Sequence, residues 1–440
     1  MRQHLRVFAL FAGVALTITA CGGSSSGTNA SAAPSQTGSA ATSSPAAEPS
    51  PSTSGVPVRS NADLVIWTDE LKAPAVRSVA DTFATANGIT VDVQVVSSDL
   101  QAAVVTANAA GNGPDVFTGA HDWIGNLVQN GTLEPLQLTP DQLGTYADVA
   151  VKATTYNGKL YGLPYGVEAL ALYRNTAVAP DAPKTLDDAF TTGAAAVKAK
   201  KVESAFNLQV GDNGDAYHME PLLTSMGGYM FGTEANGNYD PKDLGIGKAG
   251  SVAAAKKIGA LGEKGSKVLR RSISGDNSIA LFASGKAAYL VSGPWALGDV
   301  QKGGIKYAIS PIPGFAGQKT AQPFAGVQAL YVASKGKNKA FAQEFVANGM
   351  NTEAAMQAMY DGTKLPPTLK SLQAKVASQP DVKVFVDAAA KANPMPAIPA
   401  MQAVWEPLGK AYAAIVGGAD PTKTITTAGK TINAAIAKAG

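Results

Sequence analysis

The first folded segment of the chain, residues 63–118, reads DLVIWTDELKAPAVRSVADTFATANGITVDVQVVSSDLQAAVVTANAAGNGPDVFT. Apolar runs that predict buried strands alternate in it with stretches of helical spacing. The expected order is strand, helix, strand, helix, strand, over Leu64–Trp67, 74–88, Ile89–Val96, 100–110 and Asp115–Thr118. This order predicts an α/β sheet with crossover helices. Ligands bind such sheets at the C-terminal ends of the strands, which indicates the loops after Trp67, Val96 and Thr118.

The same alternation continues toward the C-terminus. Asn157-Gly158 predicts a type I′ hairpin turn. Further strands are expected over Ser204–Leu208, Ala287–Val291, 306–310 and 326–333, with helices over 185–201 and 250–263 and a helix from about Asp276. The last ~100 residues are expected to be mostly helical.

The N-terminus has the pattern of an export signal. Arg2 and Arg6 precede an apolar stretch, Val7–Leu16, that is too short to span a bilayer. The single cysteine of the chain closes the run Ile18-Thr19-Ala20-Cys21, which resembles a bacterial lipobox. We therefore expect residues 1–20 to be a lipoprotein signal peptide and Cys21 to be lipidated. The alternative is an incidental thiol beside a plain cleavage site. We favour lipidation because the chain has no other cysteine with which Cys21 could pair.

A spacer and a large body follow the signal. Residues 22–60 are almost wholly Gly, Ser, Ala, Thr and Pro, so we expect 21–60 to be a disordered tether. About 380 residues remain, enough for two lobes. Charged residues make up only 16% of the chain, which excludes a highly charged, unfolded chain. Removal of the signal, with Arg2 and Arg6, lowers the net charge from +3 to +1. This balance argues against nucleic-acid binding.

Several motifs of the body resemble those of ABC-transporter extracellular solute-binding proteins of family 1, in particular the maltose/maltodextrin-binding proteins. These motifs are Gly113–Val116, Ala120–Asp122, Gly158–Asn175, Gly227–Tyr229, Gly237–Asp240, Ser292–Trp295 and Met395-Pro396, with Trp405 downstream. They occur in collinear order, and the resemblance covers about residues 63–440.

The resemblance implies an α/β, two-lobed periplasmic-binding-protein-like fold of type II, with the ligand cleft between the lobes. The first lobe would comprise residues 61–166 and 327–372, and the second 167–326 and 373–440. It further implies a monomeric, non-enzymatic protein that captures sugar and delivers it to ABC permease subunits driven by an ATPase. The lipid on Cys21 would hold it at the outer face of the bacterial cell membrane.

A neutral sugar offers hydroxyls on its edges and C–H patches on its faces. Carboxylates accept several hydroxyl hydrogen bonds, and aromatic rings cover the apolar faces, so the expected site combines both. The resemblance carries this role onto Asp69, Glu70, Lys72, Asp122, Trp123, Glu168, Tyr217, Trp295 and Trp405. Asp215 is a weaker candidate, and the loop at Asp69 and Glu70 leaves open which acid contacts the ligand. The competing interpretations are a helix cap for Asp122, a solvated hinge charge for Glu168 and core packing for the tryptophans, which we prefer for Trp67.

The sequence departs from the maltose-binding pattern beside Asp122. Gly119 stands where those proteins have a tryptophan, and Trp123 stands where they have an arginine. Ser98–Gln101 lacks the glutamates expected near the sugar. A maltooligosaccharide is the favoured ligand, and trehalose or another oligosaccharide is the alternative.

Two other function classes remain open. A secreted glycoside hydrolase would use two of the acids at a fixed separation across one glycosidic bond. A binder of peptides or other solutes could use the same fold. No cofactor or metal is expected: the G-x-G-x-x-G match at 245–250 follows no clear strand and reads as a helix entry, and His121 and His218 lie far apart in sequence. We interpret His121 as a structural hydrogen-bonding residue.

Overall fold

A computed structural model describes residues 57–235 and 238–439 of the chain. Contacts divide the chain into two units, Met1–Thr53 and Ser54–Gly440, and only the second contains described residues. The expected signal peptide and the lipidation of Cys21 lie outside the described residues. None of the helices among these residues combines the length and the apolar character that crossing a bilayer requires.

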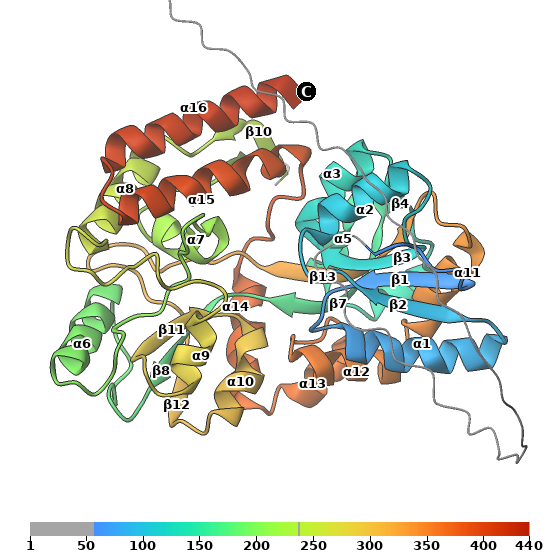
Figure 1. Cartoon of the computed structure of the whole chain (residues 1–440), viewed down its shortest axis with the longest axis horizontal. Coiled ribbons are helices and arrows are strands. Elements are labelled where there is room, and N and C mark those ends of the chain that lie inside the picture. The colour runs from blue at the N-terminus through green and yellow to red at the C-terminus, as the bar shows by residue number, and fades with distance from the viewer. Residues whose placement is uncertain (1–56, 236–237, 440) are drawn as a thin grey trace, which may run out of the picture. The chain divides into compact units, whose positions relative to one another are not determined.

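The first sheet contains the segment with which the body begins. Its strands are β1 (Leu64–Thr68), β2 (Val91–Val95), β3 (Val116–Ala120), β4 (Leu133–Glu134), β7 (Gly162–Glu168) and β13 (Gly326–Ala333). They lie in the order β2-β1-β3-β13-β4, with β7 also paired to β13 (Figure 1). The β1 strand pairs in parallel with β2 and β3, whereas β13 is antiparallel to β3 and β7. The predicted α/β sheet with crossover helices is therefore confirmed.

The helices of this part begin and end where the sequence signals them. Pro74 lies in the first turn of α1 (Ala73–Asn87), and Gly88 ends it at φ 63°. The others are α2 (Leu100–Ala109), α3 (Ile124–Gln129), α4 (Pro140–Gly144), α5 (Asp148–Thr154), α11 (Lys339–Glu344), α12 (Glu353–Thr363), α13 (Lys370–Val376) and the π-helical turn Phe345–Gly349. The predicted hairpin is also present: Asn157 and Gly158, both at positive φ, join β5 (Thr155–Tyr156) to β6 (Lys159–Leu160).

The second sheet is built from β8 (Ala171–Asn175), β11 (Tyr289–Ser292) and β12 (Tyr307–Ser310), in the antiparallel order β11-β8-β12. The expected strand Ser204–Leu208 is not formed as a regular strand. It contributes two isolated parallel bridges, Ser204 with Ala287 and Asn207 with Leu290. A small hairpin joins β9 (Phe231–Thr233) to β10 (Tyr239–Leu244). The two sheets thus give the two-lobed α/β fold, and the exact lobe boundaries stay a prediction.

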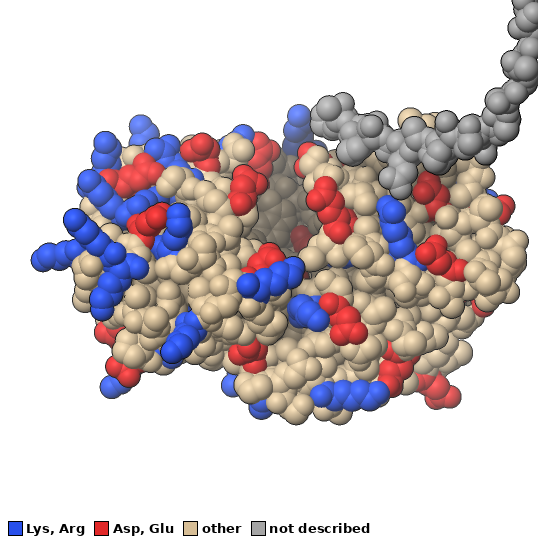
Figure 2. Space-filling view, turned by 60° about the horizontal axis from the view of Figure 1, so that its bottom comes forward, with Lys and Arg blue, Asp and Glu red and all other residues tan. Residues whose placement is uncertain are grey.

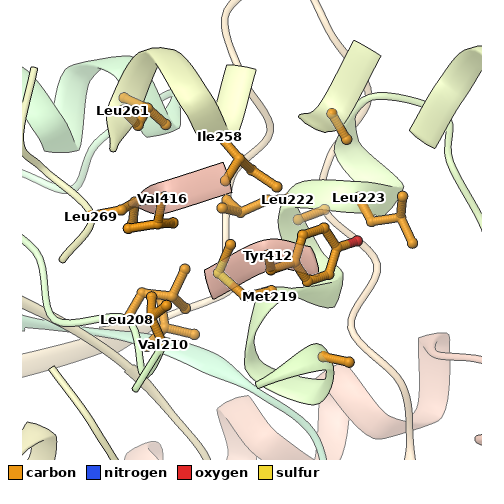
Figure 3. Close-up of a cluster of buried hydrophobic side chains, with 14 of the residues drawn as sticks. Leu208, Val210, Met219, Leu222, Leu223, Ile258, Leu261, Leu269, Tyr412 and Val416 are labelled. Carbon is orange, nitrogen blue, oxygen red and sulfur yellow. The ribbon is translucent and has the colours of Figure 1, made fainter. Parts of the chain in front are cut away.

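The helices of this part pack against the second sheet and against one another. They are α6 (Leu186–Lys198), α7 (Ala216–Ser225), α8 (Ala249–Leu261), α9 (Ser278–Ala283), α10 (Leu297–Lys302), α14 (Pro380–Lys391), α15 (Gln402–Val416) and α16 (Pro421–Ala439). Three-residue 3₁₀ turns at His121–Trp123, Pro294–Ala296 and Pro399–Met401 complete the elements. Figure 3 shows Tyr412 of α15 packed near Met219 and Leu222 of α7 and Ile258 of α8. This apolar contact fixes α7 and α15, which both carry predicted site residues.

The N-terminal end of the body is fastened by a buried ion pair. The side chain of Arg59 is 3% exposed, and its guanidinium contacts the Asp115 carboxylate at 2.6 Å. Asp115 also accepts hydrogen bonds from the backbone amides of Val65 and Asn338. Ordered contacts therefore begin before Asp63, within the last residues of the expected tether.

Candidate functional site

His121 holds the chain in place at the C-terminal end of β3. Its Nδ1 accepts a hydrogen bond from the amide of Val327 at 3.0 Å, so the ring proton lies on Nε2 and is donated to the carbonyl of Met395 at 3.1 Å. Burial lowers the pKa of His121 to about 4, which keeps the ring neutral. The predicted structural role of His121 is confirmed, and its contacts fix the position of Asp122.

Asp122 is a buried carboxyl whose side chain makes no helix-capping hydrogen bond. Burial raises its pKa to about 7, opposed by a hydrogen bond from the side chain of Trp405 and reinforced by the nearby charge of Glu168. Residues from the 3₁₀ turn after β3 and from α15, almost 300 positions apart in the chain, therefore meet here. The contact joins two of the predicted site residues directly.

Glu168 ends β7 and is also buried, only 9% exposed, so it is not a solvated hinge charge. Gln328 of β13 donates its side-chain amide to the Glu168 carboxyl at 3.2 Å. Burial raises the pKa of Glu168, against the lowering effects of Gln328, Lys72 and His218. Gly326 leaves room for this side chain, because a Cβ there would lie 2.5 Å from the Glu168 Cγ.

The two acids that follow β1 have different surroundings. Asp69 forms an ion pair with Lys72 and acts electrostatically on Glu168. Glu70 is exposed and accepts a hydrogen bond from the Ser97 hydroxyl at 3.0 Å. The structure therefore groups Asp69 and Lys72 with Glu168 and leaves Glu70 facing another loop.

Aromatic rings gather around Trp295, in the 3₁₀ turn that follows β11. Its ring centroid lies 6.4 Å from that of Tyr217 and 6.1 Å from that of His218. Gly293 makes this position possible, because a Cβ there would lie 2.0 Å from the Trp295 ring. Trp295 is partly buried and packs against apolar clusters of both lobes. Burial, together with the nearby charges of Glu168 and Asp122, raises the pKa of the Tyr217 hydroxyl, so the rings and the acids share one region.

The ring of Trp123 lies over Gly119. A Cβ at Gly119 would come within 2.4 Å of the Trp123 ring, so only glycine fits beneath it. The two departures from the maltose-binding pattern are thus one structural feature. Trp123 is partly buried and packs against the core of the first sheet while standing next to Asp122.

Asp215 caps helix α7. It accepts hydrogen bonds from the His218 amide and from the His218 Nδ1, each at 2.8 Å, and from the Gln209 amide at 2.6 Å. Burial would raise the pKa of Asp215, but His218 and Gln209 together lower it, which keeps the carboxylate ionised. Trp67 is fully buried with its indole nitrogen bound to Gln94, so the packing interpretation of Trp67 is confirmed.

Two residues of this region were missed by sequence reasoning. Gln328 is a partly buried polar residue within the otherwise apolar strand β13, and this exception was the available signal. His218 was set aside as an isolated histidine, yet it contacts Asp215 and the Trp295 ring. In the described part of the chain, no cluster of three or more His, Cys, Asp or Glu side chains could hold a metal ion. Gly245–Gly250 lies at the entry to α8, as interpreted.

The arrangement has the composition that a neutral sugar requires: buried carboxyls flanked by aromatic rings. Figure 2 shows one face of the molecule hollowed near its centre. Residues 78–386 match the family described as bacterial extracellular solute-binding protein. The chain belongs to this family.

Relatives of this solute-binding protein bind oligosaccharides, by their names. A galactooligosaccharide-binding protein of Bacillus subtilis (strain 168) is 29% identical, over 98% of this chain and 97% of its own. A maltodextrin-binding protein of the same organism is 29% identical, over 78% of this chain and 82% of its own. A maltooligosaccharide ABC transporter solute-binding lipoprotein of Streptococcus pneumoniae (strain ATCC BAA-255 / R6) is 30% identical, over 72% and 75%. The ABC-transporter solute-binding resemblance is therefore confirmed.

Proposed function

We propose that this chain is the sugar-capturing lipoprotein of an ABC importer, anchored outside the cell membrane through Cys21, and that it binds maltooligosaccharides. The observation that carries the proposal is the meeting of Asp122, Glu168 and Trp405 beside the rings of Tyr217 and Trp295. Carboxyls there can accept sugar hydroxyls as they leave water, and the rings can cover the C–H faces. The protein is proposed to deliver its ligand to permease subunits without chemical change.

The named relatives support the oligosaccharide class, and they include both maltooligosaccharide and galactooligosaccharide binders. We favour α-glucosides because the collinear motifs follow the maltose-binding pattern. Trehalose or another oligosaccharide is the alternative, since Trp123 over Gly119 changes the surface beside Asp122.

Replacement of the buried acid Glu168 tests whether its carboxyl contacts the sugar. We expect Glu168→Gln to weaken maltotriose binding about tenfold, because a neutral amide accepts weaker hydrogen bonds than a carboxylate. Calorimetric titration measures this, with the exposed Glu70→Gln as the matched control at unchanged affinity. Equal affinity of Glu168→Gln and the native protein would move the site elsewhere. Chromatography of the incubated maltotriose should recover it intact, and released glucose would favour a hydrolase.

Binding should strengthen with rising pH through the titration of Asp122. Its pKa of about 7 in the ligand-free protein means that a pH near 6 leaves it mostly protonated, whereas the ionised carboxylate accepts stronger hydrogen bonds from sugar hydroxyls. We therefore expect affinity to rise between about pH 6 and 8, and Asp122→Asn to flatten this profile. Asp181 is exposed, and Asp181→Asn is the control that should keep the native pH profile of affinity. A profile that is unchanged in Asp122→Asn would contradict the role of Asp122.

The same shift has a consequence for stability, with the opposite sign. The folded-state pKa of Asp122 lies above its ordinary value of 3.8, so the folded protein binds the proton more tightly than the unfolded chain. The resulting contribution is fully present below about pH 4 and is lost as the pH rises through about 7. In the ligand-free protein, Asp122 therefore stabilises the fold least in the pH range where ligand binding is strongest.

A further inference from the structure

A separate pocket opens beside helix α7, outside the candidate site. Its volume is about 320 Å³, and none of the described residues that line it belongs to the predicted set. Thr224 of α7, Tyr239 of β10, and Gln322, Phe324 and Asn393 contribute to its wall. This volume is at the lower end of the ~300–1,000 Å³ of small-molecule sites, which fits one or two sugar residues.

Glu220 lines this pocket with a buried carboxyl, one oxygen of which has no hydrogen-bond partner in the part that the structure describes. The side chain is 3% exposed, and its Oε2 has no hydrogen-bond partner among the described residues. Burial raises the pKa of Glu220 well above its ordinary range, which favours the neutral carboxylic acid, a form that can both donate and accept hydrogen bonds. An unsatisfied buried polar atom is destabilising, and a hydrogen-bonding ligand that reaches this oxygen would remove that cost.

Two tyrosine hydroxyls lie within electrostatic reach of Glu220. Tyr239 donates its hydroxyl to the carbonyl of Pro394 at 2.6 Å. The hydroxyl of Tyr412 has no partner in the described part of the chain. Figure 3 shows the Tyr412 ring within the apolar cluster and its hydroxyl directed away from Leu208 and Val210. Two of the unsatisfied buried polar atoms of the described residues, Glu220 Oε2 and the Tyr412 hydroxyl, therefore belong to groups that interact electrostatically.

We propose that this pocket is a second carbohydrate site, which takes a neutral mono- or disaccharide independently of the candidate site. Its wall combines hydrogen-bonding side chains (Glu220, Thr224, Gln322 and Asn393) with the rings of Tyr229, Phe231, Tyr239 and Phe324. Rings that cover C–H faces and amides that bind hydroxyls form the chemistry of sugar recognition. Glu220 is the single acid among the described lining residues, so the wall does not offer the several oxygen ligands of a metal site.

The test weakens the candidate site first, and substitutions in the pocket wall then report the second site separately. Saturation-transfer NMR with D-glucose and with D-galactose is recorded on the full chain carrying Trp405→Ala. We expect saturation transfer from at least one sugar, with an apparent Kd raised about tenfold or more when Glu220→Ala is added. Because Glu220→Ala removes a buried side chain, the exposed Gln322→Ala provides a second variant, which should also weaken binding.

Gln318→Ala is the matched control, since Gln318 is exposed on the same segment and does not line the pocket. The Gln318→Ala control should bind both sugars with the affinity of the Trp405→Ala background. Absence of saturation transfer from both sugars in that background would overturn the second site and leave ordered water as the partner of Glu220. Equal binding by Glu220→Ala, Gln322→Ala and the background would overturn it too. Neither outcome touches the proposed function, which depends on maltotriose binding by the native chain.

Discussion

Trp405→Ala should weaken maltotriose binding by about 2 kcal/mol or more, roughly thirtyfold, without unfolding the protein. The indole has two functions in this account: its side chain hydrogen-bonds to the buried carboxyl of Asp122, and its ring offers apolar area to a sugar face. Removal of the ring deprives Asp122 of a partner and the ligand of a stacking surface. Calorimetric titration measures the affinity, and a thermal melt reports the fold.

Trp405→Phe separates the two functions, because it keeps an aromatic face and loses the indole N–H. We expect this variant to lie between the native protein and Trp405→Ala. Trp295→Ala should also weaken binding, since its ring faces Tyr217 and His218. Unchanged affinity in both Trp405→Ala and Trp295→Ala would remove the site assignment, whatever the behaviour of Glu168.

Asp115→Asn should lower the free energy of unfolding by about 3–5 kcal/mol. The carboxylate is fully buried, pairs with the buried Arg59 and accepts backbone hydrogen bonds from Val65 and Asn338. Loss of its charge leaves the guanidinium buried without an anion, which is more costly than the loss of an exposed pair. Denaturant-induced unfolding, followed by fluorescence, measures the change.

The control for this prediction is an ion pair of the same chemistry at the surface. Asp148 pairs with Lys370, and its side chain is 96% exposed. Asp148→Asn should therefore change the free energy of unfolding by less than about 1 kcal/mol. In the double variant Arg59→Met/Asp115→Asn, part of the loss should be recovered, because no buried charge is left unpaired. A loss in Asp115→Asn as small as that in Asp148→Asn would contradict the structural role of the buried pair.

Local patterns predicted the first sheet and the position of Asp122, because apolar periodicity and helix-end signals are encoded within a few residues. The expected strand at Ser204–Leu208 failed for a tertiary reason. That segment pairs only through isolated bridges, from Ser204 to Ala287 just before β11 and from Asn207 to Leu290 within β11. Pairing over such a distance leaves no local trace in the sequence.

The directions of the side chains in the loops could not be predicted from the sequence. The choice between Asp69 and Glu70 depends on which loop each one faces, and Ser97, distant in sequence, binds Glu70. Gln328 joins the site for the same reason, since β13 enters the first sheet from more than 150 residues after β7. The resemblance supplied Glu168 and the tryptophans, whereas the position of the Trp123 ring over Gly119 required the backbone.

The most direct test of the central claim is tryptophan fluorescence of the purified full chain, titrated with maltose, maltotriose, longer maltodextrins, trehalose, cellobiose and a galactooligosaccharide. Trp295 and Trp405 stand among the acids and rings of the candidate site, so ligand binding should change their emission. The account predicts a saturable change with the maltooligosaccharide series. A saturable change with the galactooligosaccharide alone would reassign the ligand, and no change with any sugar, supported by calorimetry, would contradict sugar capture at this site.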